Sequence, residues 1–272
     1  MKLQLYWEFV KIAFRSRLAY RSEVGVLFVG RVLALFVQVA IWKALLGIEG
    51  AAESRIGSVT LREMVTYVII SRTISVFVSL FAGYSPLWRI GEKIRTGEIA
   101  MDLTRPVALR ENMFFETLGN NLFEIVFGAL PMLLTGALVF GLDVPQPVYL
   151  LLFAVATVNG LLIYFLLSYM AGLIAFWYLT VWHLERLLND LILVFSGALI
   201  PLWFFPPFLV TVSEWLPFRL IYYTPISIYL EKHLLPEVGL LILQQLVWLG
   251  LLLLLERAMW KRGIQKLVIQ GG

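Results

Sequence analysis

Long apolar runs separated by short polar segments dominate the sequence. A helix needs about 20 mostly apolar residues to cross the hydrocarbon core of a bilayer, and six runs reach that length. They cover residues 24–47, 63–84, 114–141, 148–179, 188–208 and 237–256. The fourth run is long enough to tilt or to extend beyond the membrane. The pattern predicts an all-α integral membrane protein with six transmembrane helices, organised as one transmembrane domain over residues 1–272.

The composition supports this fold class. Of 272 residues, 60% are hydrophobic and only 15% are charged, whereas soluble domains carry roughly 25% charged residues. The sequence contains no cysteine and two histidines, which excludes disulfides and argues against a metal site. We therefore expect neither a bound metal nor a nucleic-acid partner.

The basic residues are concentrated in alternate connections between the apolar runs. Five Lys or Arg residues lie in residues 1–23, five in 85–113, one in the turn after the fourth run and four in the C-terminal tail. The opposite connections hold Arg55, Arg62, Arg219 and Lys232. Because cytoplasmic connections of membrane proteins are enriched in Lys and Arg, this asymmetry predicts a cell-membrane protein with both termini in the cytoplasm.

The first 23 residues predict a basic amphipathic helix that lies in the inner membrane interface. Apolar residues recur at spacings of three and four from Leu3 to Leu18, with Lys11 and Arg15 on the other side. Two interpretations stay open. The helix is either a simple anchor on the membrane surface or an elbow that steers the first span against a partner.

Residues 201–236 combine several prolines with many aromatic side chains. Proline interrupts helices, so this segment predicts short helices that re-enter the outer leaflet. Irregular backbone at membrane depth must be shielded by protein or line a wet cavity. One interpretation is an outer gate, and the other is an aromatic belt, since Trp and Tyr favour interfaces in any case. The residues expected in the gate are Phe204, Phe205, Phe208 and Trp215.

Two charges fall deep inside apolar runs. At a rise of about 1.5 Å per residue, Arg72 in the second run and Glu124 in the third both lie about 15 Å from the inner ends, whereas Arg31 can snorkel to the inner interface. We predict an Arg72–Glu124 ion pair, which either lines a translocation path or locks two helices together. The neighbouring Asn120 and Asn121 place more polar groups on the bundle-facing side. Gly119 and Gly128 would permit close helix approach.

The connection at residues 85–113 is the richest polar stretch of the chain. Ser85-Pro86 predicts a helix start and Gly97 a helix end, followed by another turn over 98–103 that stops at Pro106. The apolar stripe contains Leu87, Ile90, Ile94, Ile99 and Leu103, and we expect Arg89, Lys93 and Arg95 on the exposed side. Such a helix could dock into a groove of another protein or touch anionic lipid. The acidic residues Glu92, Glu98 and Asp102 argue mildly against adhesion to lipid alone.

Common catalytic motifs are missing from the sequence. No G-x-x-x-x-G-K-[ST], H-E-x-x-H or G-x-S-x-G occurs. The chain therefore has no P-loop of its own, and we expect it not to be an enzyme. If ATP drives the protein, the ATP must be hydrolysed in a separate subunit.

The pattern I-R-x-G-E-I-x-x-x-L-x-R-P, residues 94–106, resembles the six-span permeases of type-2 ABC exporters. It is most similar to the branch that works with an ATPase and a second, related permease. The resemblance covers essentially the whole chain, from the basic N-terminal helix to the proline-aromatic stretch before the last span. It implies an efflux permease that forms the substrate path with a second six-span chain, identical or paralogous.

The resemblance also implies a mechanism. Residues 85–105 would be a coupling helix seated on a soluble P-loop ATPase, which binds ATP and Mg²⁺ and passes its movement to spans one, two and five. The expected coupling residues are Arg89, Lys93, Arg95, Glu98, Asp102 and Arg105. The alternative is an ATP-independent membrane transporter or scaffold protein, and an intramembrane enzyme is a more remote one.

Overall fold

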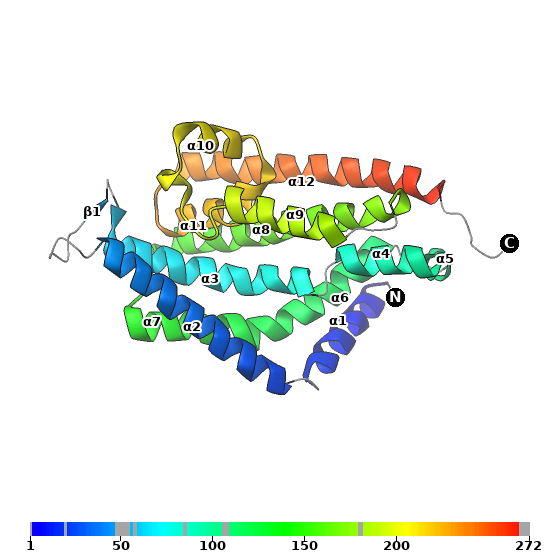
Figure 1. Ribbon diagram of the computed structural model, residues 1–272, viewed down its shortest axis with the longest axis horizontal. Coiled ribbons are helices and arrows are strands. Elements are labelled where there is room, and N and C mark those ends of the chain that lie inside the picture. Colours follow the sequence, from blue (N-terminus) through cyan, green and yellow to red (C-terminus); the bar gives the residue numbers. More distant parts are fainter. Residues whose placement is uncertain are drawn as a thin grey trace.

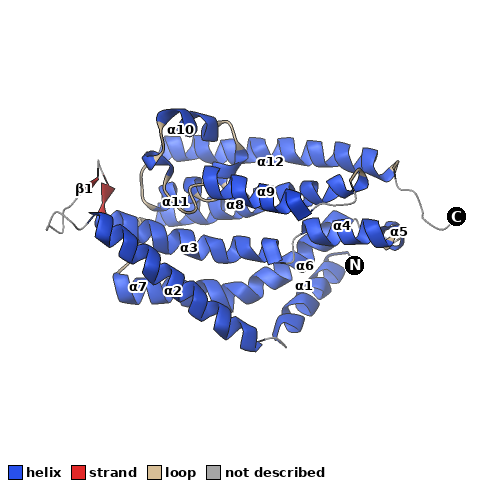
Figure 2. Ribbon diagram, in the orientation of Figure 1, coloured by secondary structure: helices blue, strands red, loops and turns tan. Residues whose placement is uncertain are grey.

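The computed structural model of the protein is a bundle of long helices joined by short turns (Figures 1 and 2). It describes residues 2–18, 21–46, 55–56, 59–83, 86–104, 109–178 and 182–266. The longer helices are α1 (Lys2–Leu18), α2 (Arg21–Leu46), α3 (Leu61–Gly83), α4 (Pro86–Thr96), α6 (Leu109–Glu124), α7 (Leu130–Phe140), α8 (Pro147–Leu173), α9 (Trp182–Phe195) and α12 (Leu235–Ile264).

The shorter elements complete the fold. They are the strands β1 (Arg55–Ile56) and β2 (Val59–Thr60), the helices α5 (Ile99–Leu103), α10 (Pro207–Glu214) and α11 (Tyr223–Tyr229), the π-helical turn η1 (Ile125–Ala129), and the 3₁₀ turns η2 (Ile174–Phe176), η3 (Leu202–Phe204) and η4 (Pro217–Leu220). The two strands form one antiparallel pair with Arg55 opposite Thr60.

Four helical stretches are long and apolar enough to cross a membrane. They are Gly25–Leu45, Leu109–Phe140, Pro147–Phe176 and Leu235–Ile264, and they coincide with the first, third, fourth and sixth predicted runs. Helix α3 covers the second run with 23 residues. The prediction of an all-α membrane protein is confirmed, while the full set of six crossings stays a prediction.

The fifth predicted span is wrong as a single helix over 188–208. Helix α9 has 14 residues and ends at Phe195, so it extends only about 21 Å in a hydrocarbon core about 30 Å thick. Gly197 follows with φ 78°, a left-handed conformation that glycine adopts without strain, and Pro201 prevents the helix from resuming. The chain then continues through η3 and the short helices α10 and α11, as the prolines of residues 201–236 predict.

The third span is a continuous helical stretch with one π-helical turn in its middle. The turn η1 joins α6 to α7, and Pro131 sits in the first turn of α7. Proline has no N–H to donate, and a π-helical turn accommodates such an interruption by shifting the hydrogen-bond pattern. The helix surface is therefore widened between Ile125 and Ala129.

The two ends of the bundle carry different elements (Figure 1). Helix α1 begins and α12 ends near α4 and α5, whereas β1, α10 and α11 lie toward the other end. The main apolar core lies between α3, α4, α8, α9, α11 and α12 and includes Tyr67, Ile90, Ile163, Tyr169 and Leu252. A second cluster joins α2, α3 and α7.

Candidate functional site

Helices α4 and α5 form a compact polar unit at the end of the bundle where α1 begins (Figure 1). As the sequence predicts, α4 begins at Pro86 and Gly97 separates it from α5 with φ 79°. The apolar stripe faces inward: Leu87, Ile90 and Ile99 are each 0% exposed. These residues seat the unit mainly against α8 and η2.

Two of the expected coupling cations are partly buried in ion pairs instead of lying on the exposed side, as the sequence predicts, while their part in coupling stays a prediction. The Arg89 Nη2 atom lies 2.6 Å from Glu116 Oε2 and ties α4 to α6. The Lys93 ammonium pairs with the carboxylate of Asp102, which is buried, and so ties α4 to α5. Arg89, Lys93 and Asp102 therefore hold the helix pair in place. The sixth expected residue, Arg105, lies outside the described residues.

The outer face of the unit is formed by a different set of residues. Trp88, Glu92 and Arg95 are exposed and, at spacings of four and three, share one side of α4. Glu98 in the turn and Met101 of α5 are also exposed. We name these five residues the platform face. Trp88 is 51% exposed and Met101 60%, which is a large apolar area for a surface otherwise made of charges.

The beginning of α9 adds an acidic group beside the platform face. Burial raises the pKa of the Glu185 carboxyl, and a hydrogen bond from Trp88 offsets part of that rise. The sequence reasoning missed Trp88 because a single aromatic residue in an amphipathic helix also fits a membrane interface. Its spacing from Glu92 and Arg95 is the signal that could have revealed it.

Further ion pairs brace this end of the bundle. Arg110 Nη1 lies 2.7 Å from Oε2 of the buried Glu256 and joins α6 to α12. Tyr6 donates a hydrogen bond to Glu111 and stacks on Phe115 with ring centroids 4.4 Å apart, which joins α1 to α6. The platform face thus sits on a network that reaches α1, α6, α8 and α12.

A family model described as "ABC-2 family transporter protein" matches residues 32–271. The chain belongs to the ABC-2 transporter family. Its members are membrane components of ABC transporters that generally work with a separate ATPase subunit. The comparison with curated proteins gives no match.

The buried charges of this ABC-2 protein are paired differently from the sequence-based prediction. Glu124 is 4% exposed, and its Oε2 lies 2.7 Å from Arg31 Nη1 of α2. The predicted Arg72–Glu124 ion pair is therefore wrong. Gly128 explains the choice: a Cβ atom there would lie 2.9 Å from Glu124 Oε2 and 3.0 Å from Arg31 Nη1. The bare glycine lets the Arg31 side chain reach the third span, which confirms the predicted close approach at Gly128.

Arg72 instead belongs to a polar network around the break in the fifth span. Its Nε donates to Gln38 Oε1 at 2.6 Å, and the Gln38 amide donates to the carbonyl of Leu199 at 3.0 Å. Ser71 donates to the carbonyl of Ala198 at 2.6 Å, and Tyr67 donates to that of Gly197. Side chains of α2 and α3 thus satisfy the backbone that α9 leaves open, as irregular backbone in a membrane requires.

A small cavity with polar and apolar walls adjoins this network. Its volume is about 240 Å³, and its polar lining residues are Arg72, Ser75, Tyr164, Asn189 and Tyr222. Within the described residues, no carboxylate lies within ion-pair distance of Arg72. The cavity therefore presents a guanidinium to whatever enters it. The side chains of Asn120 and Asn121, which were expected to share the bundle interior, lie outside the described part of the chain.

The four residues of the expected outer gate differ in exposure. Phe204 stacks on Trp42 of α2 with ring centroids 5.3 Å apart. Phe208 is 66% exposed and Trp215 79% exposed, whereas Phe205 is half-buried. The short helices of this segment match the prediction, and its role as a gate stays a prediction.

Proposed function

We propose that this ABC-2 chain is the permease subunit of an ATP-driven exporter. A separate P-loop ATPase binds the platform face of α4 and α5, and ATP and Mg²⁺ bind in that ATPase. A second permease chain, identical or paralogous, completes the substrate path. The observation that carries the proposal is an exposed face of mixed charge and apolar area on a helix pair that is buried and ion-paired on its other side.

The contacts of α4 favour a particular route for mechanical transmission. Its inner side packs on α8, its Arg89 pairs with α6, and its Trp88 bonds to Glu185 of α9. A displacement of the platform by the ATPase would therefore reach spans three, four and five directly. The family resemblance implies spans one, two and five, so α9 is the element on which both lines of reasoning agree.

The proposed orientation follows from the cations. The platform end carries the tracts that are richest in Lys and Arg, and such tracts remain in the cytoplasm. Both termini and the platform are then cytoplasmic, and α10 and α11 face the opposite side. In this orientation, the Arg72 cavity lies within the bundle as part of the substrate path, and the proline-aromatic segment beyond it acts as the lid.

Co-purification with the ATPase tests the proposal. The chain is co-expressed with its cognate P-loop ATPase, and the ATPase that remains on the purified membrane complex is quantified. Arg95→Glu and Glu98→Arg, made separately, should each release the ATPase. Lys261→Glu changes an exposed cation on α12 at the same end and should leave the complex intact. Full retention of the ATPase by both platform variants would refute the assignment.

A further inference from the structure

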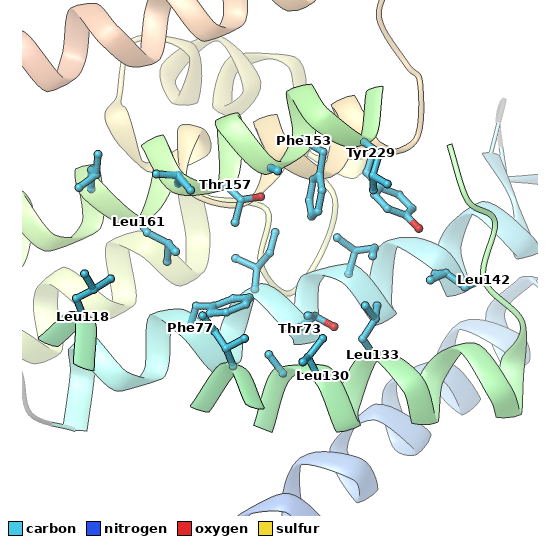
Figure 3. Close-up of a pocket in the computed structure, with 18 of the residues that line it drawn as sticks. Thr73, Phe77, Leu118, Leu130, Leu133, Leu142, Phe153, Thr157, Leu161 and Tyr229 are labelled. Atoms are coloured by element: carbon cyan, nitrogen blue, oxygen red, sulfur yellow. The ribbon is translucent and has the colours of Figure 1, made fainter. Parts of the chain in front are cut away.

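A large apolar cavity lies away from the platform face and the Arg72 network. It occupies about 590 Å³ between α3, α8 and the helical stretch α6–η1–α7 (Figure 3). Phe77 and Thr73 line it from α3, Leu130 and Leu133 from α7, and Phe153 and Leu161 from α8. The widened turn η1 contributes Ile125 and Ala129, so the π-helical geometry helps to shape the cavity wall.

The cavity is a slot parallel to the helices. Its lining residues on α8 run from Leu150 to Leu162, and twelve steps of about 1.5 Å make it about 18 Å long. Half of a hydrocarbon core about 30 Å thick is about 15 Å, so the slot matches one leaflet. Along its side, Leu150 is 43% exposed and Val158 56% exposed, which leaves it open toward the lipid.

The volume is sufficient for a long hydrocarbon chain. An apolar cavity of roughly 150 Å³ stays dry and accepts benzene, with six carbon atoms. The slot is about four times larger and by the same measure accepts on the order of 20 carbon atoms. A void of this size would forfeit dispersion contacts along its whole lining, so surrounding hydrocarbon will occupy it.

The chemistry of the lining excludes a charged ligand. The polar side chains that line it are Thr73, Thr157 and Tyr229. Thr73 donates internally to the carbonyl of Ile69 at 2.8 Å. Thr157 lies among the cavity walls in Figure 3, and its buried hydroxyl has no hydrogen-bond partner. The lining is otherwise hydrocarbon, and it supplies no charge along the slot.

A charged pair lies near the end of the slot that faces the loop between α7 and α8. Leu142 and Val144 line the slot there. Between them in sequence lies Asp143, whose Oδ1 is 2.6 Å from Arg62 Nη2. Both charged side chains are solvent-accessible, at 49% and 78%. This exposed pair offers one cation and one anion to a headgroup that carries the opposite two.

We propose that the slot binds one acyl chain of a phospholipid from the leaflet next to the α7–α8 loop, with a zwitterionic headgroup beside Arg62 and Asp143. The site lies within a single chain and is separate from the Arg72 cavity. It requires only that the chain spans a membrane, so it stands or falls independently of the proposed ATPase coupling.

Photo-crosslinking tests the proposal. The full-length chain is reconstituted in phosphatidylcholine vesicles that contain a phosphatidylcholine with a diazirine on one acyl chain. After illumination, labelled peptides are mapped by mass spectrometry. We expect labelling concentrated on α8 residues 150–162 and on the facing part of α3. Equal labelling of the lipid-facing sides of α2 and α12, with no enrichment in the slot, would overturn the proposal.

Four variants sharpen this test. Ala154 lines the slot from its open side, so Ala154→Trp should reduce slot labelling to background. Ala154→Leu, a smaller change that serves if the Trp variant does not fold, should reduce slot labelling partly. Leu151→Trp adds the same ring at a neighbouring position outside the slot that is 64% exposed, and it should leave labelling unchanged. Thr157→Val should also leave labelling unchanged. Two results would contradict an acyl-chain site: loss of slot labelling in Thr157→Val, or unchanged slot labelling in both Ala154 variants.

Discussion

The Arg31–Glu124 ion pair gives the sharpest prediction about how the bundle is held together. Glu124→Gln removes the negative charge from the 2.7 Å contact between Glu124 Oε2 and Arg31 Nη1. Breaking a buried ion pair from one side costs about 3–5 kcal/mol. The Glu124 side chain is 5% exposed but that of Arg31 is 22% exposed, so the Arg31 side chain is less completely buried than its partner. We therefore expect a loss of about 3 kcal/mol, at the lower end of that range.

Removing both charges should cost much less than the two single changes predict. Arg31→Met combined with Glu124→Gln removes both charges of this pair, and it loses about 1 kcal/mol of hydrogen bonding. The double-mutant cycle should therefore give a coupling energy of about 2 kcal/mol or more. Unfolding by denaturant in micelles, followed by the fluorescence of the nine tryptophans, provides the required free energies. Thiol-reactive dyes cannot be used, because the chain has no cysteine.

A second cycle supplies the control. Arg72→Met pairs with Glu124→Gln in the same assay, and because Arg72 bonds to Gln38 instead, the two changes should add within about 0.5 kcal/mol. A coupling energy above about 1 kcal/mol for Arg72 with Glu124, together with additivity for Arg31 with Glu124, would refute the pairing described here.

The remaining predictions concern the platform and its supports. Gly119→Leu should destabilise the protein by about 1–3 kcal/mol through overpacking, because the backbone of α1 leaves no room for a side chain there; Gly250→Leu, at an open position, is its control in the same denaturation assay. Asp102→Asn should weaken ATPase co-purification by loosening α5, and rescue by the combined Lys93→Met would show that the loss comes from an unpaired ammonium. Burial raises the pKa of Glu185, so the protonated carboxyl contributes stability to the fold below its ordinary pKa. This contribution is lost as the pH rises through the raised pKa. Glu185→Gln should accordingly raise Tm at neutral pH, with a gain that shrinks toward about pH 4, and an equal gain at both values would contradict the assigned shift.

Local patterns predicted the helices and the platform well. Pro86 and Gly97 mark the ends of α4 because the first presets the backbone for a helix start and the second accepts a left-handed conformation. These signals act over a few residues and need no knowledge of neighbouring helices. The inward side of the platform followed from the spacing of Leu87, Ile90 and Ile99 for the same reason.

Charge partners were beyond the reach of the same reasoning. The distance of Glu124 from the inner end of its span places it at the same depth as more than one cation. That distance does not decide which helix lies beside Glu124. The lateral contact depends on Gly128, which lets α2 approach the third span at that level. Helical periodicity likewise places Arg89 and Lys93 opposite the apolar stripe, and therefore on the exposed side. It cannot reveal that a carboxylate on α6 or on α5 lies within reach of each cation.

The break in the fifth span has a similar origin. The apolar run over 188–208 is long enough to predict one helix, and a single glycine such as Gly197 within it does not by itself predict a helix end. The structure ends α9 there because Tyr67, Ser71 and Gln38 donate hydrogen bonds to the carbonyl groups that the helix leaves open. Those side chains come from distant parts of the sequence. Only the folded arrangement therefore shows that the carbonyl groups at the helix break have hydrogen-bond donors inside the membrane.

Crosslinking from the platform face tests the central claim most directly. The chain has no cysteine, so Met101→Cys introduces one thiol on the platform face and Lys261→Cys one on α12 as the control. Each thiol is tagged with a photoactivatable maleimide in membranes that contain the cognate ATPase. We expect a covalent permease–ATPase adduct from Met101→Cys and none from Lys261→Cys. An adduct from the α12 position alone would contradict it.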